Sequence, residues 1–279
     1  QRGGLERHGW FFPNGSPQDV INSYGRQSWF PFWAEEHAAA RNGVAMFDLS
    51  TFSKLQVQGH HAEQFLQRMC ANDVAISPGK LVYTALLNEN AGIESDLTVT
   101  RLNETTYLII TGSLQGRRDA NWLWRHVSDD EHVVITDVTS AYAVLSITGP
   151  RSRDLLSRVS TADLSNDSFP FGTAKEIEVG YAIATALRVS YAGELGWELY
   201  VPCDLAESVF EQLIDASDGL ALRLAGLHAL ASLRIEKGFR SWGHDIGPAD
   251  TPVEAGLMFA VRPTKPVAFL GRDAVLRQR

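Results

Sequence analysis

Hydrophobic and polar residues alternate along several short stretches of the chain, which is the pattern of β-strands with one buried face. The predicted strands cover residues 55–58, 97–101, 107–110, 143–147, 186–190 and 197–201. Apolar positions spaced three to four residues apart predict amphipathic helices instead, over residues 61–69, 115–127, 150–159, 206–216 and 227–238. Many short strands joined by turns, with helices between pairs of them, predict an antiparallel α+β fold rather than a doubly wound parallel sheet.

The two halves of the chain resemble each other at a constant offset of 90 residues. "KLQVQGHHAEQFLQRM" matches "VLSITGPRSRDLLSRV", and each contains an alternating strand, a glycine (Gly59 or Gly149) and the start of a helix. At the same offset "LTVTRL" falls on "LRVSYA", and "YLIITGSL" falls on "WELYVPCD". Three matches at one offset indicate an internal duplication. We therefore predict two related tandem units, residues 17–140 and 141–279.

The composition is that of an ordinary globular protein, and the charge argues against one class of partner. Of 279 residues, 44% are hydrophobic, and 25 Lys and Arg against 33 Asp and Glu give a net charge of −8. This balance provides no global positive field to hold a nucleic-acid backbone, so we expect no nucleic-acid partner. The sequence contains no apolar run of about eighteen residues and no signal-peptide pattern, so we expect no association with membranes.

The cysteines and histidines do not form a recognisable metal site. Cys70 and Cys203 lie far apart without a CxxC motif, which favours reduced structural thiols and a cytoplasmic protein, or a mitochondrial-matrix protein in a eukaryote. His60, His61 and His244 fit solvent-facing or capping roles better than ligation. The usual dinucleotide, nucleoside triphosphate, serine-hydrolase and zinc-protease motifs are also lacking. We therefore expect no metal.

Two carboxylates, Glu94 and Asp96, stand where a turn is predicted to lead into a strand, in "LLNENAGIESDLTVTRL". An aspartate at this place can cap a hairpin, because Asp and Asn commonly bond to the backbone of their own turns. At the offset of 90 residues, however, Asp96 aligns with Ala186, so the duplicated scaffold does not require an acid there. The turn-cap interpretation remains open, but the repeat favours a functional role for Asp96.

Five segments of the chain resemble the folate-binding aminomethyltransferase family of the glycine-cleavage T-protein. They are "FDLSTFSKLQVQG", "YTALLNENAGIESDLTV", "AVLSITGPRSRDLL", "RVSYAGELGWELYVP" and "LRIEKGFRSWGHDIGPADTPVEAGL". In particular, they look like the C-terminal folate domain of FAD-dependent sarcosine and dimethylglycine dehydrogenases, over roughly residues 17–277. The resemblance implies two related units around a central folate channel. Residues 1–16 resemble the end of a segment that joins such a domain to a flavin-bearing part, in keeping with Gln rather than Met at position 1.

The resemblance implies a catalytic role for Asp96, which matches the family aspartate that faces N10 of tetrahydrofolate in the channel. Tyr83 matches a tyrosine beside the pterin or aminobenzoate, and Thr111 matches a small polar contact from the next strand. From pattern alone, Tyr83 would be a packing residue, because tyrosine is common in strands. The catalytic and cofactor-contact roles therefore rest on the resemblance.

Three further residues match pterin-side positions. Tyr191 and Glu198 do so directly, and Tyr200 shares the strand face of Glu198 because side chains alternate. A carboxylate can accept two of the adjacent N–H donors on a pterin edge, which suits Glu198. From pattern alone, the tyrosines would be packing residues, and Glu198 would be an exposed residue between Trp197 and Leu199.

The segment around residues 230–242 leaves alternatives open. Trp242 lines the folate channel or packs the loop after the preceding helix. Arg234 and Arg240 meet the folate glutamate, or they are cations at the negative end of a helix. One departure from the family is Leu230, at a position where glycine-cleavage enzymes commonly carry an arginine that binds the carboxylate tail of the substrate. The small C-terminal β-barrel domain of the family is a second element that we expect to be absent from this chain.

Two hypotheses about function follow from the resemblance. In the first, a flavin domain, in cis or as a subunit, oxidises an N-methyl amine, and tetrahydrofolate captures the iminium or formaldehyde product as 5,10-methylenetetrahydrofolate. FAD would then be bound only by that N-terminal domain. In the second, the chain is a non-catalytic folate-binding or regulatory module; a stand-alone aminomethyltransferase or demethylase is a further alternative. Asp96 together with Tyr83 and Glu198 favours the enzyme.

Overall fold

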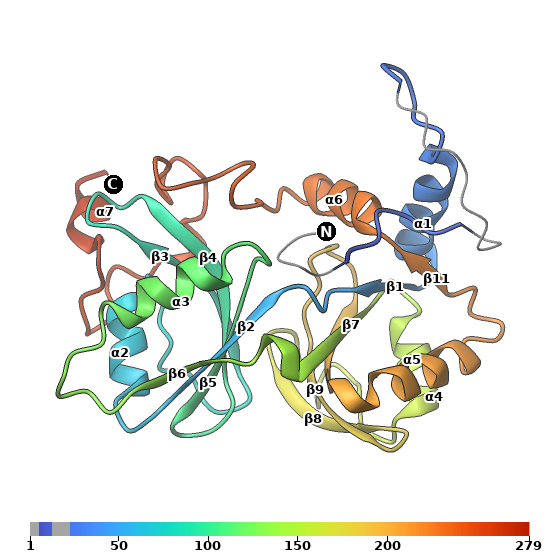
Figure 1. Cartoon of the computed structure of the whole chain (residues 1–279), viewed down its shortest axis with the longest axis horizontal. Coiled ribbons are helices and arrows are strands. Elements are labelled where there is room, and N and C mark those ends of the chain that lie inside the picture. The colour runs from blue at the N-terminus through green and yellow to red at the C-terminus, as the bar shows by residue number, and fades with distance from the viewer. Residues whose placement is uncertain (1–5, 13–22, 279) are drawn as a thin grey trace. The chain divides into compact units, whose positions relative to one another are not determined.

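The computed structural model describes residues 6–12 and 23–278, and the chain divides into two compact units (Figure 1). Unit 1 comprises Gln1–Thr51, Ala141–Phe171 and Lys175–Phe239, and unit 2 comprises Phe52–Ser140, Gly172–Ala174 and Arg240–Arg279. Each unit is therefore assembled from segments that are distant in the sequence. The predicted division into residues 17–140 and 141–279 follows sequence similarity rather than spatial contacts, and it stays a prediction.

Unit 2 is built on a five-stranded antiparallel sheet with the strand order β3-β4-β5-β2-β6. Its strands are β2 (Ser53–Gln58), β3 (Leu81–Leu87), β4 (Ile93–Arg101), β5 (Thr106–Thr111) and β6 (Val134–Asp137). Helices α2 (Ala62–Met69) and α3 (Gly116–Trp124) share a buried apolar cluster with one face of this sheet. On β4 that face carries Leu97 and Val99, so Asp96 and Thr98 point to the opposite face.

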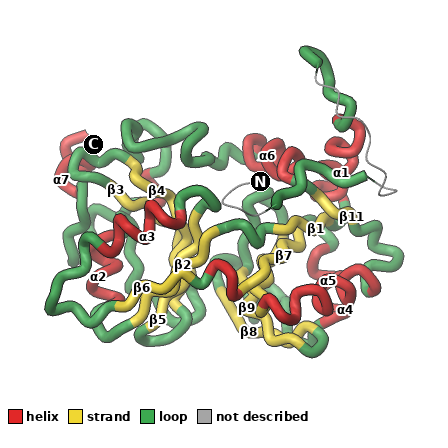
Figure 2. The backbone as a smooth tube through the Cα atoms, viewed as in Figure 1, coloured by secondary structure: helices red, strands yellow, loops and turns green. Residues whose placement is uncertain are grey.

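The C-terminal part of the chain packs against β3, and Figure 2 shows most of it as loop before the last helix. It contains the 3-10 helix η3 (Met258–Ala260) and helix α7 (Arg272–Gln278). Buried side chains of this segment form one cluster with residues of β3: Ala85, Leu87, Leu257, Val261, Phe269 and Val275. Tyr83 lies at the edge of the same cluster and is only partly buried.

Unit 1 contains a six-stranded sheet with the order β11-β1-β7-β10-β9-β8. Its strands are β1 (Ala45–Asp48), β7 (Tyr142–Thr148), β8 (Ala174–Val179), β9 (Ala182–Leu187), β10 (Gly196–Pro202) and β11 (Arg223–Ala225). β7 pairs antiparallel with β1 and β10, whereas β11 pairs parallel with β1. Helices α4 (Ser152–Val159) and α5 (Ala206–Asp215) close the core around Trp197, and α1 (Phe30–Asn42) contacts α6 (Leu227–Glu236).

The α+β class is confirmed, but one predicted strand is misplaced and helix α1 is not predicted. The sequence patterns also do not predict strands β1, β3, β6, β8 and β11. The strand predicted at residues 186–190 overlaps only the end of β9, which stops at Leu187, because the chain turns there and the backbone N–H of Val189 donates to the carbonyl of Leu187 at 3.0 Å. Helix α1 is not predicted from its apolar spacing, because only Glu36 and Ala40 of this helix are buried. A helix without an apolar stripe gives no periodic signal.

The two glycines of the repeat occupy similar turns. Gly59 follows β2 and precedes α2 with φ of 140°, and Gly149 follows β7 and precedes α4 with φ of 128°. A Cβ at Gly59 would lie 1.9 Å from the carbonyl oxygen of His132, so no other residue fits there without a shift of the backbone. The strand orders β3-β4-β5-β2-β6 and β8-β9-β10-β7-β1 also correspond. These likenesses are what the duplication predicts, and the duplication itself stays a prediction.

Candidate functional site

Asp96 and Tyr83 meet on the face of the unit 2 sheet that does not carry α2 and α3. Asp96 is opposite Ala85 in the β3-β4 register, and Tyr83 lies two residues before Ala85 on the same face. The Tyr83 hydroxyl donates to Oδ2 of Asp96 at 2.8 Å. The Tyr83 ring stacks on Phe259 of η3, with 5.9 Å between the ring centroids and 72% of Phe259 exposed. No sequence motif singles out Phe259, because its proximity to Tyr83 arises only in the tertiary structure.

The hairpin turn between β3 and β4 is closed by Asn88 and not by Asp96. The Asn88 side-chain oxygen accepts hydrogen bonds from the backbone N–H groups of Asn90 at 3.0 Å and Gly92 at 2.8 Å. Strand β4 already begins at Ile93, so Asp96 lies within the strand. The interpretation of Asp96 as a turn cap is therefore wrong, because the turn is satisfied by an Asx-type bond made earlier in the chain.

Replacing Asn88 by Ala is expected to destabilise unit 2 by about 1–2 kcal/mol, because two turn N–H groups lose their acceptor. The side-chain amide of Asn88 also donates to Oε1 of Glu94 at 2.9 Å, and this hydrogen bond is lost in the variant too. Thermal unfolding measures the effect. Asn90→Ala is the matched control, because only the backbone of this exposed residue takes part in the turn. Equal melting temperatures for the two variants would contradict this account.

Glu94, the second carboxylate of the segment, belongs to a structural ion pair. Arg118 of α3 donates to its carboxylate and to its backbone carbonyl, and the Arg118 guanidinium lies 4.7 Å from the centroid of the Trp242 ring. The Trp242 indole N–H donates to the carbonyl of Ile93 at 2.8 Å. These contacts agree with the packing alternative for Trp242. The segment thus separates its two acids, with Glu94 engaged in packing and Asp96 bonded to Tyr83.

The electrostatic surroundings of Asp96 favour its neutral form more than water does. Burial raises the pKa of this carboxyl, and the hydrogen bonds from Tyr83 and from a backbone N–H offset the rise in part. Proton affinity raised in this way is what a carboxylate needs to accept a proton from a weakly acidic N–H group. Asp96 and Tyr83 can therefore act as a hydrogen-bonded base and its orienting partner.

Thr111 lies on the other face of the sheet from Asp96. Its hydroxyl donates to Oδ2 of Asp119 in α3 at 2.5 Å and lies 3.4 Å from the hydroxyl of Ser95. Ser95 and Asp96 are neighbours on β4 and point in opposite directions. The structure therefore does not bring Thr111 to Asp96 and Tyr83, and its surroundings give no support to the expected folate contact.

Glu198 and Tyr200 of β10 lie on one face of the unit 1 sheet. The Tyr200 hydroxyl donates to Oε2 of Glu198 at 3.0 Å, in agreement with the shared face expected from alternation. Tyr200 is buried and Glu198 is half-buried, whereas an ordinary strand glutamate between two core residues would be exposed. Burial raises the pKa of Glu198 to about 7, and the Tyr200 hydroxyl offsets part of that rise. Near neutral pH this carboxyl is therefore divided between its two forms.

The remaining predicted residues of unit 1 are in separate surroundings. The Tyr191 ring stacks on Phe239 with 6.1 Å between the ring centroids. Arg234 is buried and donates to the carbonyl of Phe239 at 2.9 Å, beyond the C-terminal end of α6, which agrees with its helix-end alternative. Arg240, in unit 2, donates to the carbonyl of Ala255 at 3.1 Å. These contacts hold backbone in place and do not by themselves indicate a ligand.

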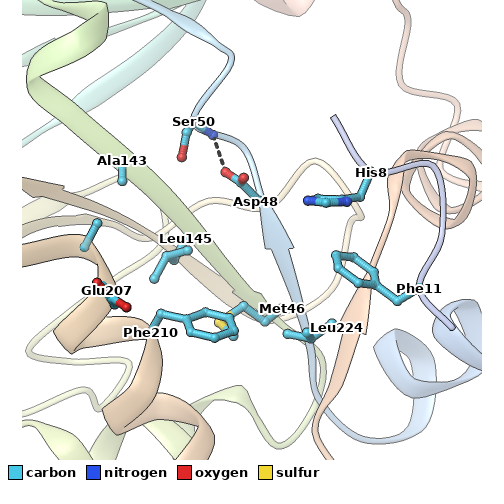
Figure 3. A pocket seen from close by; sticks show the side chains of 11 residues that line it. His8, Phe11, Met46, Asp48, Ser50, Ala143, Leu145, Glu207, Phe210 and Leu224 are labelled. Atoms are coloured by element: carbon cyan, nitrogen blue, oxygen red, sulfur yellow. Dashed lines mark hydrogen bonds between the residues drawn. The ribbon is translucent and has the colours of Figure 1, made fainter. Parts of the chain in front are cut away.

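A cavity of about 320 Å³ opens in unit 1 beside β1 (Figure 3). Met46, Leu145 and Phe210 form much of its apolar wall, and Asp48 accepts a hydrogen bond from the backbone of Ser50. None of the described residues that line it is among the predicted site residues. Within residues 6–12 and 23–278, no three His, Cys, Asp or Glu side chains cluster to hold a metal, and no helix is long and apolar enough to span a membrane.

Comparison with known proteins places the chain in a family. Residues 1–265 match the family model described as the GCVT N-terminal domain. The chain belongs to this family. The match includes residues 1–16, which the sequence assigns to a preceding linker. The chain is similar in structure to the glycine cleavage system aminomethyltransferase T from Bartonella henselae, with a TM-score of 0.79 and 26% sequence identity. The superposition covers 93% of this chain and 70% of the Bartonella protein.

Curated relatives of this GCVT-family chain include oxidases and dehydrogenases. It is 44% identical over 274 residues to "4-methylaminobutanoate oxidase (formaldehyde-forming)" of Paenarthrobacter nicotinovorans. It is 36% identical to mitochondrial sarcosine dehydrogenase of Mus musculus. The alignments cover 98% and 100% of this chain but only 33% and 34% of the relatives. The chain thus spans about a third of the length of these proteins.

Proposed function

We propose that this GCVT-family chain binds tetrahydrofolate and transfers a one-carbon unit to it, forming 5,10-methylenetetrahydrofolate. The observation that carries the proposal is the carboxylate of Asp96, which has a raised pKa and is bonded to Tyr83. Asn88 closes the adjacent turn, and Glu94 makes the ion pair with Arg118. The packing of the hairpin therefore does not account for an acid at position 96.

The chemistry assigns Asp96 the role of general base. Formaldehyde, or the iminium ion from which it derives, joins N5 of the folate, and ring closure by N10 expels water or an amine. N10 loses its proton in that closure, and the ionised Asp96 carboxylate would accept the proton and pass it to solvent. Tyr83 would hold the carboxylate in one orientation through its 2.8 Å hydrogen bond. Holding the one-carbon donor and tetrahydrofolate close together would increase the rate of transfer further.

Glu198 supports the proposal from unit 1. A pterin presents adjacent N–H donors, and an ionised carboxylate accepts them in charge-assisted hydrogen bonds. Burial leaves Glu198 with a pKa of about 7, so donors from a ligand would draw it into the ionised form. We assign Glu198 to the pterin, with Tyr200 orienting its carboxylate.

The relatives supply the source of the one-carbon unit in this proposal. One is named as a formaldehyde-forming oxidase of 4-methylaminobutanoate and another as a sarcosine dehydrogenase. Both names describe oxidation of an N-methylamino acid, which releases its methyl carbon at the oxidation level of formaldehyde. We propose that this chain captures that carbon as a domain of a larger protein whose flavin-bearing part, in cis or as a subunit, oxidises such an amine with FAD.

Titration of the 279-residue chain with (6S)-tetrahydrofolate in a calorimeter tests the proposal. We expect saturable binding, and we expect 5,10-methylenetetrahydrofolate to form from formaldehyde faster than in a protein-free control, because the two compounds also condense unaided. Binding without acceleration would favour the non-catalytic folate module. Absence of binding at millimolar folate would contradict the proposed function.

A further inference from the structure

A buried lysine lies at the C-terminal end of α2, and the chemistry proposed above does not use it. Lys265 is 2% exposed, and its ammonium group donates to the backbone carbonyls of Gln67 and Cys70, each at 2.6 Å. It also donates to the carbonyl of Asn72 and to Oε1 of Gln67, both at 2.9 Å. None of these four acceptors is a carboxylate. Lys265 therefore holds backbone in place rather than balancing a charged side chain.

The location of the acceptors explains why an ammonium group is required. The last carbonyls of a helix have no partner within the helix, and the helix dipole makes its C-terminal end negative. Helix α2 ends at Met69, so the carbonyls of Gln67 and Cys70 belong to this end. An ammonium group brings three N–H donors and a positive charge to one point. A methionine of similar length would fill the space but leave all four oxygens without this donor.

The segment that follows α2 connects Lys265 to β3, which is at the edge of the sheet. The backbone N–H of Ala71 donates to the carbonyl of Ala85 at 2.9 Å. The side-chain amide of Asn72 donates to the carbonyl of Tyr83, also at 2.9 Å. Asn72, whose own carbonyl binds Lys265, therefore holds the backbone of Tyr83.

Lys265 also belongs to the part of the chain on which the Tyr83 ring stacks. Phe259, which contacts that ring, precedes Lys265 in the same C-terminal part of the chain. Between the two, the backbone N–H of Arg262 donates to the carbonyl of Ala71 at 2.9 Å. One ammonium group thus anchors both the segment that binds the Tyr83 backbone and the segment that carries the aromatic neighbour of Tyr83.

We propose that Lys265 is a positioning residue for the one-carbon transfer, holding Tyr83 where its hydroxyl donates to Asp96. This inference rests on the proposed function of Asp96. The Lys265 ammonium group donates to the end of α2 and to Asn72, so we expect its effect on the reaction to pass through the Tyr83–Asp96 hydrogen bond. A lysine that served stability alone would slow transfer equally with and without the Tyr83 hydroxyl.

A double-mutant cycle between Lys265→Met and Tyr83→Phe tests the inference, with methylene transfer above the protein-free rate as the readout. We expect Lys265→Met to slow transfer by about tenfold, because small displacements of a catalytic group have effects of this size. In the Tyr83→Phe background the same exchange should change the rate by less than about twofold. Lys80→Met, at an exposed lysine of unit 2, is the matched control and should not change the rate. A wild-type rate in Lys265→Met, or rate losses that multiply, would overturn the proposal.

A measurement without folate separates this inference from the proposed function. Burial raises the pKa of Asp96 and the Tyr83 hydroxyl opposes that rise, so a displaced Tyr83 should let the pKa rise further. The carboxyl carbons of aspartate, followed by ¹³C NMR against pH, report the midpoint. Lys265→Met should raise the Asp96 midpoint as Tyr83→Phe does, with no further rise in the double variant. An unchanged midpoint in Lys265→Met refutes the inference, whereas a failure of the proposed function would appear as an absence of folate binding.

Asn72→Ala decides the question if Lys265→Met does not fold. This variant removes the side-chain amide that binds the Tyr83 carbonyl but keeps all four acceptors of Lys265. It should slow transfer and raise the Asp96 midpoint, again with no further effect when Tyr83 is Phe. Wild-type values of both quantities in Asn72→Ala would contradict the proposed path from Lys265 to Tyr83.

Discussion

Asp96→Asn is expected to lower the corrected rate of methylene transfer by about a hundredfold to ten-thousandfold, the usual contribution of a general base. The amide matches the carboxylate in size and can still accept the hydrogen bond from Tyr83, so most folate affinity should remain. The measurement is the rate of 5,10-methylenetetrahydrofolate formation from formaldehyde, with the rate of the protein-free condensation subtracted. A corrected rate equal to that of wild type would remove Asp96 from the chemistry.

Stability provides the control for this prediction. The pKa of Asp96 is raised by burial, so ionisation of this carboxyl opposes folding as the pH rises through that pKa. The uncharged amide of Asp96→Asn lacks that penalty, and at neutral pH the melting temperature of the variant should equal or exceed that of wild type. Tyr83→Phe is the matched second variant, because it keeps the ring stacked on Phe259 and removes only the hydroxyl. It should slow transfer less than Asp96→Asn.

Glu198→Gln is expected to weaken the binding of reduced folate by about ten- to a hundredfold at a pH of about 8. A hydrogen bond to a charged group contributes about 1.5–3 kcal/mol, and the amide offers only a neutral acceptor. Calorimetric titration with (6S)-tetrahydrofolate measures the change. Unchanged affinity would show that Glu198 does not contact the folate.

The pH dependence of binding separates the charge of Glu198 from its shape. With a pKa of about 7 in the free chain, Glu198 must lose its proton to accept pterin donors, so affinity should rise about tenfold from pH 6 to pH 8. Glu198→Gln should abolish this slope. Tyr200→Phe removes a hydroxyl that stabilises the ionised form, and it should move the rise in affinity to higher pH.

Local patterns were sufficient to predict helices α2 to α6 and part of the strands. Strands β2, β4, β5, β7 and β10 fall where alternation places them, because a sheet with one covered face imposes a period of two on the sequence itself. Alternation also places Glu198 and Tyr200 on one face of β10, where the structure shows them hydrogen-bonded. Such inferences succeed because they depend only on neighbours along a single strand.

The order of the motifs was also informative, since by itself it indicated a domain of the GCVT family. The same motifs selected Asp96, although they could not decide between a turn cap and a functional acid. That decision required the position of Asn88, because two side chains in one hairpin compete for the same turn N–H groups and the sequence does not say which one makes the bonds.

Only the tertiary structure separated the roles of residues that look alike in the sequence. Glu94 and Asp96 stand two residues apart on β4, and the register with β3 shifts at Glu94. Arg118, which arrives from α3, pairs with Glu94, whereas Tyr83 bonds to Asp96. Thr111 ends a strand that adjoins β4, yet its hydroxyl turns to Asp119 rather than to Asp96. The sequence by itself determined which residues lie on one strand and at what period. Pairing across strands, burial and the resulting shifts of pKa were decided by elements that are distant in sequence, because a carboxylate takes its proton affinity from whatever surrounds it in space.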